Sequence, residues 1–311
     1  KLSAHADFVR YNASGDDVRA MESWIEEGLY RADRHFGSRW ASVYRSAVPH
    51  FFLFDPENGD SVLIGILKPS RDRSGRRYPF VLARRIEAAL AKESPPFVLP
   101  VMFGPALSEL ESLAVDASDT LPLPEISARL ERTAGPVAPA SVRDDFESFV
   151  RSTTVEAFWN SIRPEASLPA RRSLERRVLR LARFIRAAGS VPRTQGMRFP
   201  LSRRPAGRLK EVGFWTKCVL AARGHPGVFP SIFWPASAED PAPRLFVYLA
   251  RPSPRAFLSL MDPDADPDTI FWTDGKDEEE AAGGSDRDGP PGEGTPRRPA
   301  EPTLDEFLDR L

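Results

Sequence analysis

The sequence predicts an α/β fold, a layered α-β-α sandwich with a mainly antiparallel central sheet. Two apolar segments, residues 62–67 and 78–83, flank a turn rich in arginine, proline and glycine, and together they predict a β-hairpin. Apolar residues recur at helical spacing on both sides of this hairpin. Because hairpin connections dominate the first half of the chain, we expect most neighbouring strands to be antiparallel.

The first half contains further segments with a clear local pattern. Apolar residues at helical spacing predict a helix over residues 18–35, and Asp16-Asp17 are candidates for its N-cap. The other expected elements are a short helix at 38–46, an aromatic strand at 50–54, an extended proline-rich segment at 95–104, a helix at 105–115 and a short amphipathic piece at 125–131.

The second half also mixes helices and strands. Its predicted helices are 141–160, 171–188, 209–223 and 254–261, and its predicted strands are 197–201, 229–234 and 244–249. The helix at 171–188 combines one apolar face with arginines over most of its remaining surface.

Composition divides the chain into four parts. They are a first half, 1–135, a second half packed on it, 140–273, an acidic linker, 274–302, and a short amphipathic segment, 303–311. The linker has no large apolar residue, so we expect a disordered acidic C-terminal tail. Thr303 is the expected N-cap of a final short helix.

Charge and cysteine content limit the classes of function. The 311-residue chain has a net charge of −1, so the molecule as a whole has no bulk attraction to nucleic acid or to a membrane. Its single cysteine, Cys218, excludes an intramolecular disulfide, and no apolar run reaches the roughly 18 residues that cross a bilayer. We therefore expect a cytoplasmic protein with no membrane span and no nucleic-acid partner.

Motifs of catalysis and nucleotide binding are missing from the sequence. The patterns GxxxxGK[ST], GxGxxG and GxSxG do not occur. Cys218 lies in an apolar helical segment, and acidic pairs precede helices, where the helix dipole explains them. The histidines are scattered without metal-ligand spacing: His5, His35, His50 and His225. The residues therefore predict no catalytic residues, no metal site and no cofactor, and alone they identify no active site.

The turn of the hairpin carries four arginines. Guanidinium groups form paired hydrogen bonds with oxyanions, so Arg71, Arg73, Arg76 and Arg77 can hold a phosphate or an acidic partner. A solvated loop is the alternative, and Asp72 favours it, because Asp72 can pair with Arg76 inside the turn. Both interpretations stay open on residue chemistry alone.

Charge is also segregated along the chain. Residues 163–210 contain 14 basic and two acidic residues, whereas residues 262–311 contain 16 acidic and five basic residues. A basic helix can bind nucleic acid or an anionic membrane surface. A tethered acidic tail competes with such polyanions, so we expect intramolecular screening. An ordinary exposed helix face is the remaining alternative.

The hairpin and two earlier elements resemble the TagF (ImpM) family, accessory proteins of bacterial type VI secretion systems. Asp7-Phe8 stands where the family has a GDF element, and residues 24–29 match its W-x-x-x-G-L element. The family's strand–PSxDxxGRxxP–strand hairpin is matched by Pro69, Ser70, Asp72, Gly75, Arg76 and Pro79. The resemblance covers about 1–135 well and 140–262 more loosely.

Some positions depart from the family pattern. Ala6 replaces the usual Gly, and Arg71, Ser74 and Arg77 replace residues that are usually apolar or aromatic. The turn surface is therefore more basic than the family's usual one.

The resemblance implies a non-enzymatic, cytoplasmic protein that regulates type VI secretion after translation. It implies a repressor that binds the forkhead-associated scaffold protein of the threonine-phosphorylation pathway. The candidate partner-binding residues are Trp24, Ser70, Arg71, Asp72, Arg73, Arg76, Arg77 and Tyr78. The main alternative is a structural accessory subunit of the secretion baseplate. A phosphatase and a nucleic-acid or anionic-surface binder are weaker alternatives.

Overall fold

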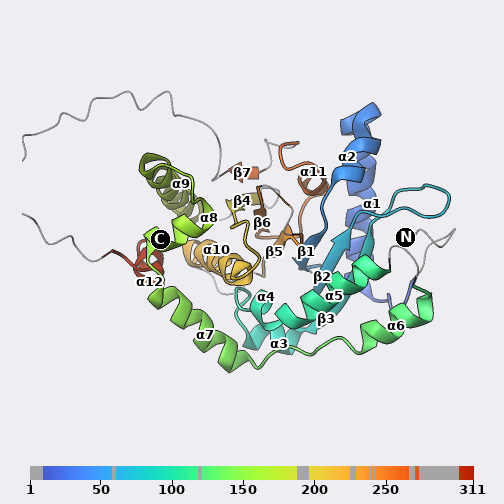
Figure 1. Cartoon of the computed structure of the whole chain (residues 1–311), viewed down its shortest axis with the longest axis horizontal. Helices are drawn as coiled ribbons and strands as arrows, with labels where there is room; N and C mark the ends of the chain where they lie inside the picture. The colour runs from blue at the N-terminus through green and yellow to red at the C-terminus, as the bar shows by residue number, and fades with distance from the viewer. Residues whose placement is uncertain are drawn as a thin grey trace, which may run out of the picture.

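A seven-stranded sheet runs through the centre of the described part of the chain (Figure 1). The computed structural model describes residues 10–57, 61–117, 121–187, 196–224, 229–237, 240, 242–265, 270–272 and 301–311. In spatial order the strands are β3 (Phe80–Glu87), β2 (Ser61–Lys68), β1 (His50–Phe54), β5 (Ser231–Pro235), β6 (Arg244–Tyr248), β4 (Gly196–Pro200) and β7 (Ile270–Trp272). Neighbouring strands are antiparallel, except that β7 lies parallel to β4.

Helices cover both faces of this sheet, which confirms the predicted layered sandwich (Figure 1). One face packs against α1 (Asp16–Phe36), α2 (Trp40–Ser46), which follows the short helix η1 (Gly37–Arg39), and α11 (Ala256–Met261). The core of the other face includes residues of α4 (Leu99–Met102), α5 (Gly104–Asp116), α6 (Leu123–Glu131), α7 (Pro139–Ser152), α8 (Val155–Ile162), α9 (Leu168–Ala187), α10 (Arg208–Arg223) and α12 (Leu304–Asp309), with α3 (Ala88–Glu93) at its margin.

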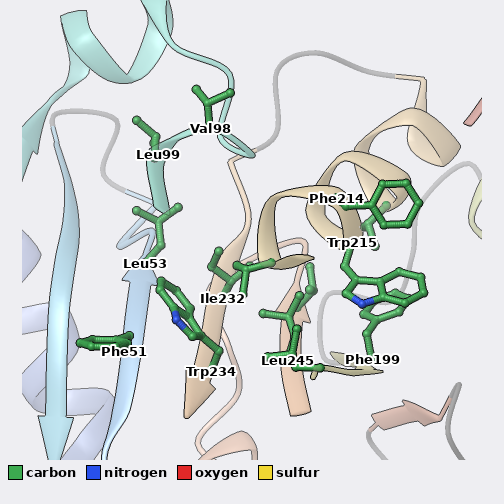
Figure 2. Packing of buried hydrophobic residues seen from close by; sticks show 14 of the residues in the cluster. Phe51, Leu53, Val98, Leu99, Phe199, Phe214, Trp215, Ile232, Trp234 and Leu245 are labelled. Atoms are coloured by element: carbon green, nitrogen blue, oxygen red, sulfur yellow. The ribbon is translucent and has the colours of Figure 1, made fainter. Parts of the chain in front are cut away.

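Burial on both faces explains the continuous aromatic run of β1. Phe51 and Leu53 join the core under α4 and α10, whereas Phe52 and Phe54 join the core under α1. Successive side chains of a strand point to opposite faces, so a strand covered on both sides needs apolar residues at every position. Figure 2 shows the first of these cores, where Trp215 of α10 stacks on Phe199 of β4 with ring centroids 4.8 Å apart.

The predicted hairpin is present, with a small shift in its second strand. β2 and β3 pair antiparallel from Ser61↔Glu87 to Lys68↔Phe80, so β3 begins two residues later than predicted and extends to Glu87. Pro79 precedes the first paired residue, where its missing N–H costs no ladder hydrogen bond.

Two predicted segments differ in the structure. Residues 95–104 were expected to be extended, but they contain α4, because Pro100 occupies the first turn of a helix, where proline is tolerated. The helix expected at 141–160 is two helices, α7 and α8, which break at the extended residues Thr153 and Thr154. The Thr154 hydroxyl caps α8 by accepting a hydrogen bond from the Ala157 N–H at 3.1 Å.

The sheet joins strands from both halves of the sequence. β1 pairs with β5 over four positions, from His50↔Pro235 to Leu53↔Ile232. The division at 1–135 and 140–273 stays a prediction. The predicted disordered linker lies outside the described residues, apart from 301 and 302. The final helix is present as α12, and Thr303 forms its capping box with Glu306, as predicted.

Candidate functional site: the arginine turn

The arginine turn, residues 69–79, is closed by its own backbone. The Asp72 N–H donates to the Arg76 carbonyl at 3.1 Å, and the Gly75 N–H donates to the Asp72 carbonyl at 2.9 Å. Gly75 has φ 85°, a left-handed conformation that glycine adopts without a steric penalty. Arg71 and Arg77 form an isolated β-bridge at the base of the turn. These contacts give the turn one defined shape.

Asp72 organises the turn from inside. Its buried carboxylate accepts hydrogen bonds from the Ser74 N–H at 3.0 Å, the Ser74 hydroxyl at 2.7 Å and the Arg76 N–H at 2.9 Å. It also accepts one from Arg76 Nε at 2.7 Å, which confirms the predicted Asp72–Arg76 pair. Hydrogen bonds to a charged acceptor are stronger than neutral ones, so this carboxylate fixes the turn firmly.

Tyr44 of α2 attaches the turn to the body of the protein. Its hydroxyl donates to the Ser70 carbonyl at 3.0 Å and accepts from the Ser70 N–H at 3.1 Å. Burial raises the pKa of Tyr44 above its ordinary value, so the hydroxyl keeps its proton and both roles at neutral pH. No local pattern predicts this contact, because it joins residues 26 positions apart.

The predicted partner-binding residues of the turn differ in their exposure to solvent. Arg73 and Arg76 are exposed, whereas Asp72 is buried. Ser70, Arg71, Arg77 and Tyr78 are half-buried. Arg73 and Arg76 therefore form most of the surface that a partner can reach, and Asp72 holds Arg76 from below.

Trp24 does not belong to this surface. Its side chain is 1% exposed, and its indole Nε1 donates to the Ser253 carbonyl at 3.0 Å. The ring stacks against Phe233, with centroids 5.2 Å apart. Its burial leaves no side-chain area for a partner, so in this structure Trp24 is a packing residue between α1 and the sheet.

A second buried aspartate holds the far end of the hairpin. Asp17 of α1 accepts hydrogen bonds from the Ser61 hydroxyl at 2.7 Å and from Arg85 Nη2 at 2.9 Å. Hydrogen bonding from Arg85 lowers the pKa of Asp17 from 3.8 to about 2. The predicted N-cap role of Asp16-Asp17 is wrong, because the N-cap residue is Gly15, which has no side chain for capping. The Asp17 carboxylate is instead engaged with the hairpin.

A groove of about 420 Å³ lies beside the turn. Its floor is β3, the terminal strand of the described sheet, and its walls are α1 and α6. The Tyr11 hydroxyl donates to Glu131 of α6, so the chain before α1 crosses the groove. Sequence reasoning missed this groove, because it combines three segments that are far apart in the chain.

The basic helix α9 presents the second arginine-rich surface. Arg172, Arg176, Arg180, Arg183 and Arg186 are exposed, and none of them forms an ion pair with another residue in the described part of the chain. Figure 1 places α9 and the β2–β3 turn at opposite ends of the view. The two basic surfaces are therefore separate.

The other side chains that could bind a metal or react do not form a cluster in the described part of the chain. Among the residues that the structure describes, no group of three or more His, Cys, Asp or Glu residues is arranged to hold a metal ion. Cys218 is buried, and burial raises the pKa of its thiol. His50 is also buried, which lowers its pKa from 6.5 to about 4 and keeps its ring neutral. None of the described helices is long and apolar enough to span a membrane.

Comparisons with known proteins found a matching family model and solved structures of similar fold. Residues 1–133 match the model of the TagF N-terminal domain, described as type VI secretion system-associated. The crystal structure of PA0076 from Pseudomonas aeruginosa PAO1 has a similar fold, with a TM-score of 0.52 and 17% sequence identity, over 87% of this chain and 96% of that chain. No curated protein matches the sequence.

Proposed function

Residues 1–133 belong to the TagF N-terminal domain family of type VI secretion-associated proteins, and from this premise we propose that the chain is a non-enzymatic repressor of type VI secretion. It acts after translation, in the cytoplasm, by binding the forkhead-associated scaffold protein of the threonine-phosphorylation pathway. The arginine turn supplies the contact, and no catalytic step is assigned to the chain.

The rigidity of the arginine turn supports this proposal most. A flexible loop loses conformational entropy when a partner orders it, whereas a turn held by Asp72 and Tyr44 loses less. Exposed guanidinium groups on a turn of defined shape suit carboxylate or phosphate groups on a partner. Clusters of arginine are a recurrent solution for binding acidic and phosphorylated motifs.

Repression requires only that the bound chain keeps the scaffold from its other partners. A docking protein achieves this by occupying surface, so it needs affinity and no turnover. Because the net charge is −1, electrostatic attraction comes from local basic surfaces such as the turn and not from the charge of the whole chain. Such local attraction affects the choice of partner and the association rate more than the total affinity.

Co-purification tests the proposal. We expect the tagged full-length chain, expressed in cells that carry the secretion cluster, to retain the forkhead-associated scaffold protein through a wash at moderate salt. Baseplate proteins are expected to wash off. Stable retention of baseplate proteins without the scaffold would overturn the proposal.

The groove beside β3 favours a second candidate, a structural accessory subunit of the baseplate. β3 ends the described sheet, and an extended segment of another protein can add to such an edge through main-chain hydrogen bonds. That kind of interface suits a stable assembly. The same co-purification distinguishes the two candidates by which protein remains bound.

A further inference from the structure

The last residues of the chain dock on the helical layer in the way a peptide ligand would. The Leu304 N–H donates to the Thr153 carbonyl at 2.9 Å, and the Val155 N–H donates to the Pro302 carbonyl at 2.8 Å. Thr154 and Thr303 form an antiparallel β-bridge between these two bonds. The break between α7 and α8 is extended, so its backbone groups are available to a neighbouring strand-like segment.

The apolar face of α12 fills a site between the surrounding helices. Leu304, Phe307, Leu308 and Leu311 are all buried, and their spacing of three, one and three places them on one helical face. They share a core with residues of α7, α8, α9 and α10. The Phe307 ring lies 6.2 Å from the ring of Phe214 on α10, centroid to centroid.

One ion pair at the rim fixes the direction of the docked helix. Arg310 Nη1 lies 2.9 Å from Oε1 of Glu175 on α9. Glu175 is the single acid within α9 and lies among exposed arginines. It is therefore the one residue of α9 that can form an ion pair with an arginine of the ligand. The site therefore recognises a capped helix with a fixed pattern of side chains. Counted from Leu304 as position 1, the pattern is Leu, Phe, Leu and Leu at positions 1, 4, 5 and 8, with Arg at position 7.

The docked segment joins the body through a long polar connection. Residues 273–300 separate it from Trp272 and contain no Leu, Ile, Val, Met, Phe, Tyr or Trp. A segment tethered in this way binds its site at an effective concentration on the order of millimolar, which a partner helix of sufficient affinity can exceed.

We propose that the surface between α7, α8 and α9 is a receptor site for a short amphipathic helix, and that residues 302–311 occupy it as an intramolecular ligand. A partner protein that presents a helix with the same apolar spacing displaces α12 and takes its place. This site is separate from the arginine turn and is independent of the repressor function proposed above.

A labelled peptide of residues 301–311 tests this exchange on the full-length chain. In wild type, α12 competes for the site, so the peptide binds weakly. In the full-length Phe307→Ala variant, the competing helix has lost its largest anchor, and we expect the peptide to bind at least about tenfold more tightly. A peptide that itself carries Phe307→Ala is the matched control and is expected not to bind.

A charge exchange shows whether the peptide occupies the same site. With Glu175→Arg added to the variant chain, we expect binding of the natural peptide to fall about threefold and binding of an Arg310→Glu peptide to recover. If Phe307→Ala impairs folding, full-length Arg310→Glu is the second variant, because Arg310 is half exposed and its loss weakens only the rim of the docked helix. It is expected to raise peptide affinity by a smaller factor.

Three results would overturn the proposal. The first is equal binding of the peptide to wild type and to a variant whose circular dichroism is native. The second is binding that ignores the charge exchange. The third is a concentration-dependent doubling of the mass of the wild-type chain, abolished by Phe307→Ala, because the displacing helix would then come from a second copy of this chain.

Discussion

The arginine turn and helix α9 are both rich in arginine, but they use it differently. In the hairpin region, Arg76 and Arg85 are each paired with a buried aspartate, Asp72 and Asp17. On α9, the exposed arginines point away from a buried apolar face, and the helix contains one acid, Glu175. The same residue type is therefore part of the architecture in one region and a solvated helix surface in the other.

This difference shows that the number of basic residues is a poor guide to a binding surface. A charge held by a buried carboxylate keeps its position when a partner arrives, whereas a charge on a free side chain loses rotamer freedom on binding. The turn has fewer arginines than α9, but its backbone has one defined shape and the Arg76 side chain is held by Asp72.

The largest effect is expected for Asp17→Ala. The substitution leaves the Ser61 hydroxyl and the Arg85 guanidinium without their shared acceptor at a buried position, which we expect to cost about 3 kcal/mol of unfolding free energy. Urea denaturation measures this change. An Arg180→Ala control on α9 should leave the midpoint almost unchanged, and equal losses for both variants would contradict the comparison.

Acid titration adds a signature for the same residue. Because the pKa of Asp17 is lowered from 3.8 to about 2 in the folded chain, its carboxylate stabilises the fold above pH 4, and this contribution disappears as the pH falls towards 2. The wild type should lose about 2 kcal/mol more than Asp17→Asn across this interval. Parallel stability curves for the two proteins would refute the assignment.

The next effect is expected for Asp72→Ala. Two backbone N–H groups, one hydroxyl and Arg76 lose their acceptor, but water reaches Ser74 and Arg76, so the loss should be about 2 kcal/mol. We also expect faster amide hydrogen exchange at Gly75 and Arg76. Unchanged exchange would mean that the backbone alone holds the turn.

Partner binding distinguishes the two arginine surfaces directly. Arg73→Glu reverses an exposed charge in the turn, and we expect it to weaken scaffold binding about tenfold, or about 1.4 kcal/mol. Arg180→Glu reverses a charge on α9 that is also exposed, and is expected to leave this affinity unchanged. Calorimetric titration with purified scaffold measures both. A larger effect from Arg180→Glu would move the binding surface to α9.

The smallest effect is expected for the α9 arginines and concerns stability alone. Replacing Arg172, Arg176, Arg180 and Arg183 together with Gln should change the unfolding free energy by less than about 0.5 kcal/mol per residue, because none of them has an ion pair in the part that the structure describes. Thermal unfolding checks this. A marked loss of stability would show that these side chains cover apolar surface with their stems.

Much of the fold was predictable because its patterns are local. The hairpin, the Asp72–Arg76 pair and the Thr303 cap each depend on residues within a few positions of one another. The errors came from features that depend on context. Pro100 suggested an extended segment, but the fixed φ of proline suits the first turn of a helix equally well, and Pro100 lies in the first turn of α4.

The position of the candidate site in the sequence was predictable, but the tertiary contacts that hold it were not. The arginines and Asp72 could be identified from their spacing, but Tyr44 could not, because only the tertiary fold brings its hydroxyl to Ser70. Trp24 lies on the apolar face of its helix, a signal that already favoured burial over partner contact. The groove beside β3 required the complete arrangement of α1, β3 and α6.

The pairing of β1 with β5 has a practical consequence for anyone who divides this chain. In a fragment that ends near residue 135, β1 would lack its partner strand β5, and the backbone groups on that side of this aromatic strand would be unpaired. In the complementary fragment, β5 would lack β1 in the same way. Bare apolar edges of this kind adhere to each other and to other chains. The two fragments should therefore precipitate when made separately and should dissolve when produced together in one cell.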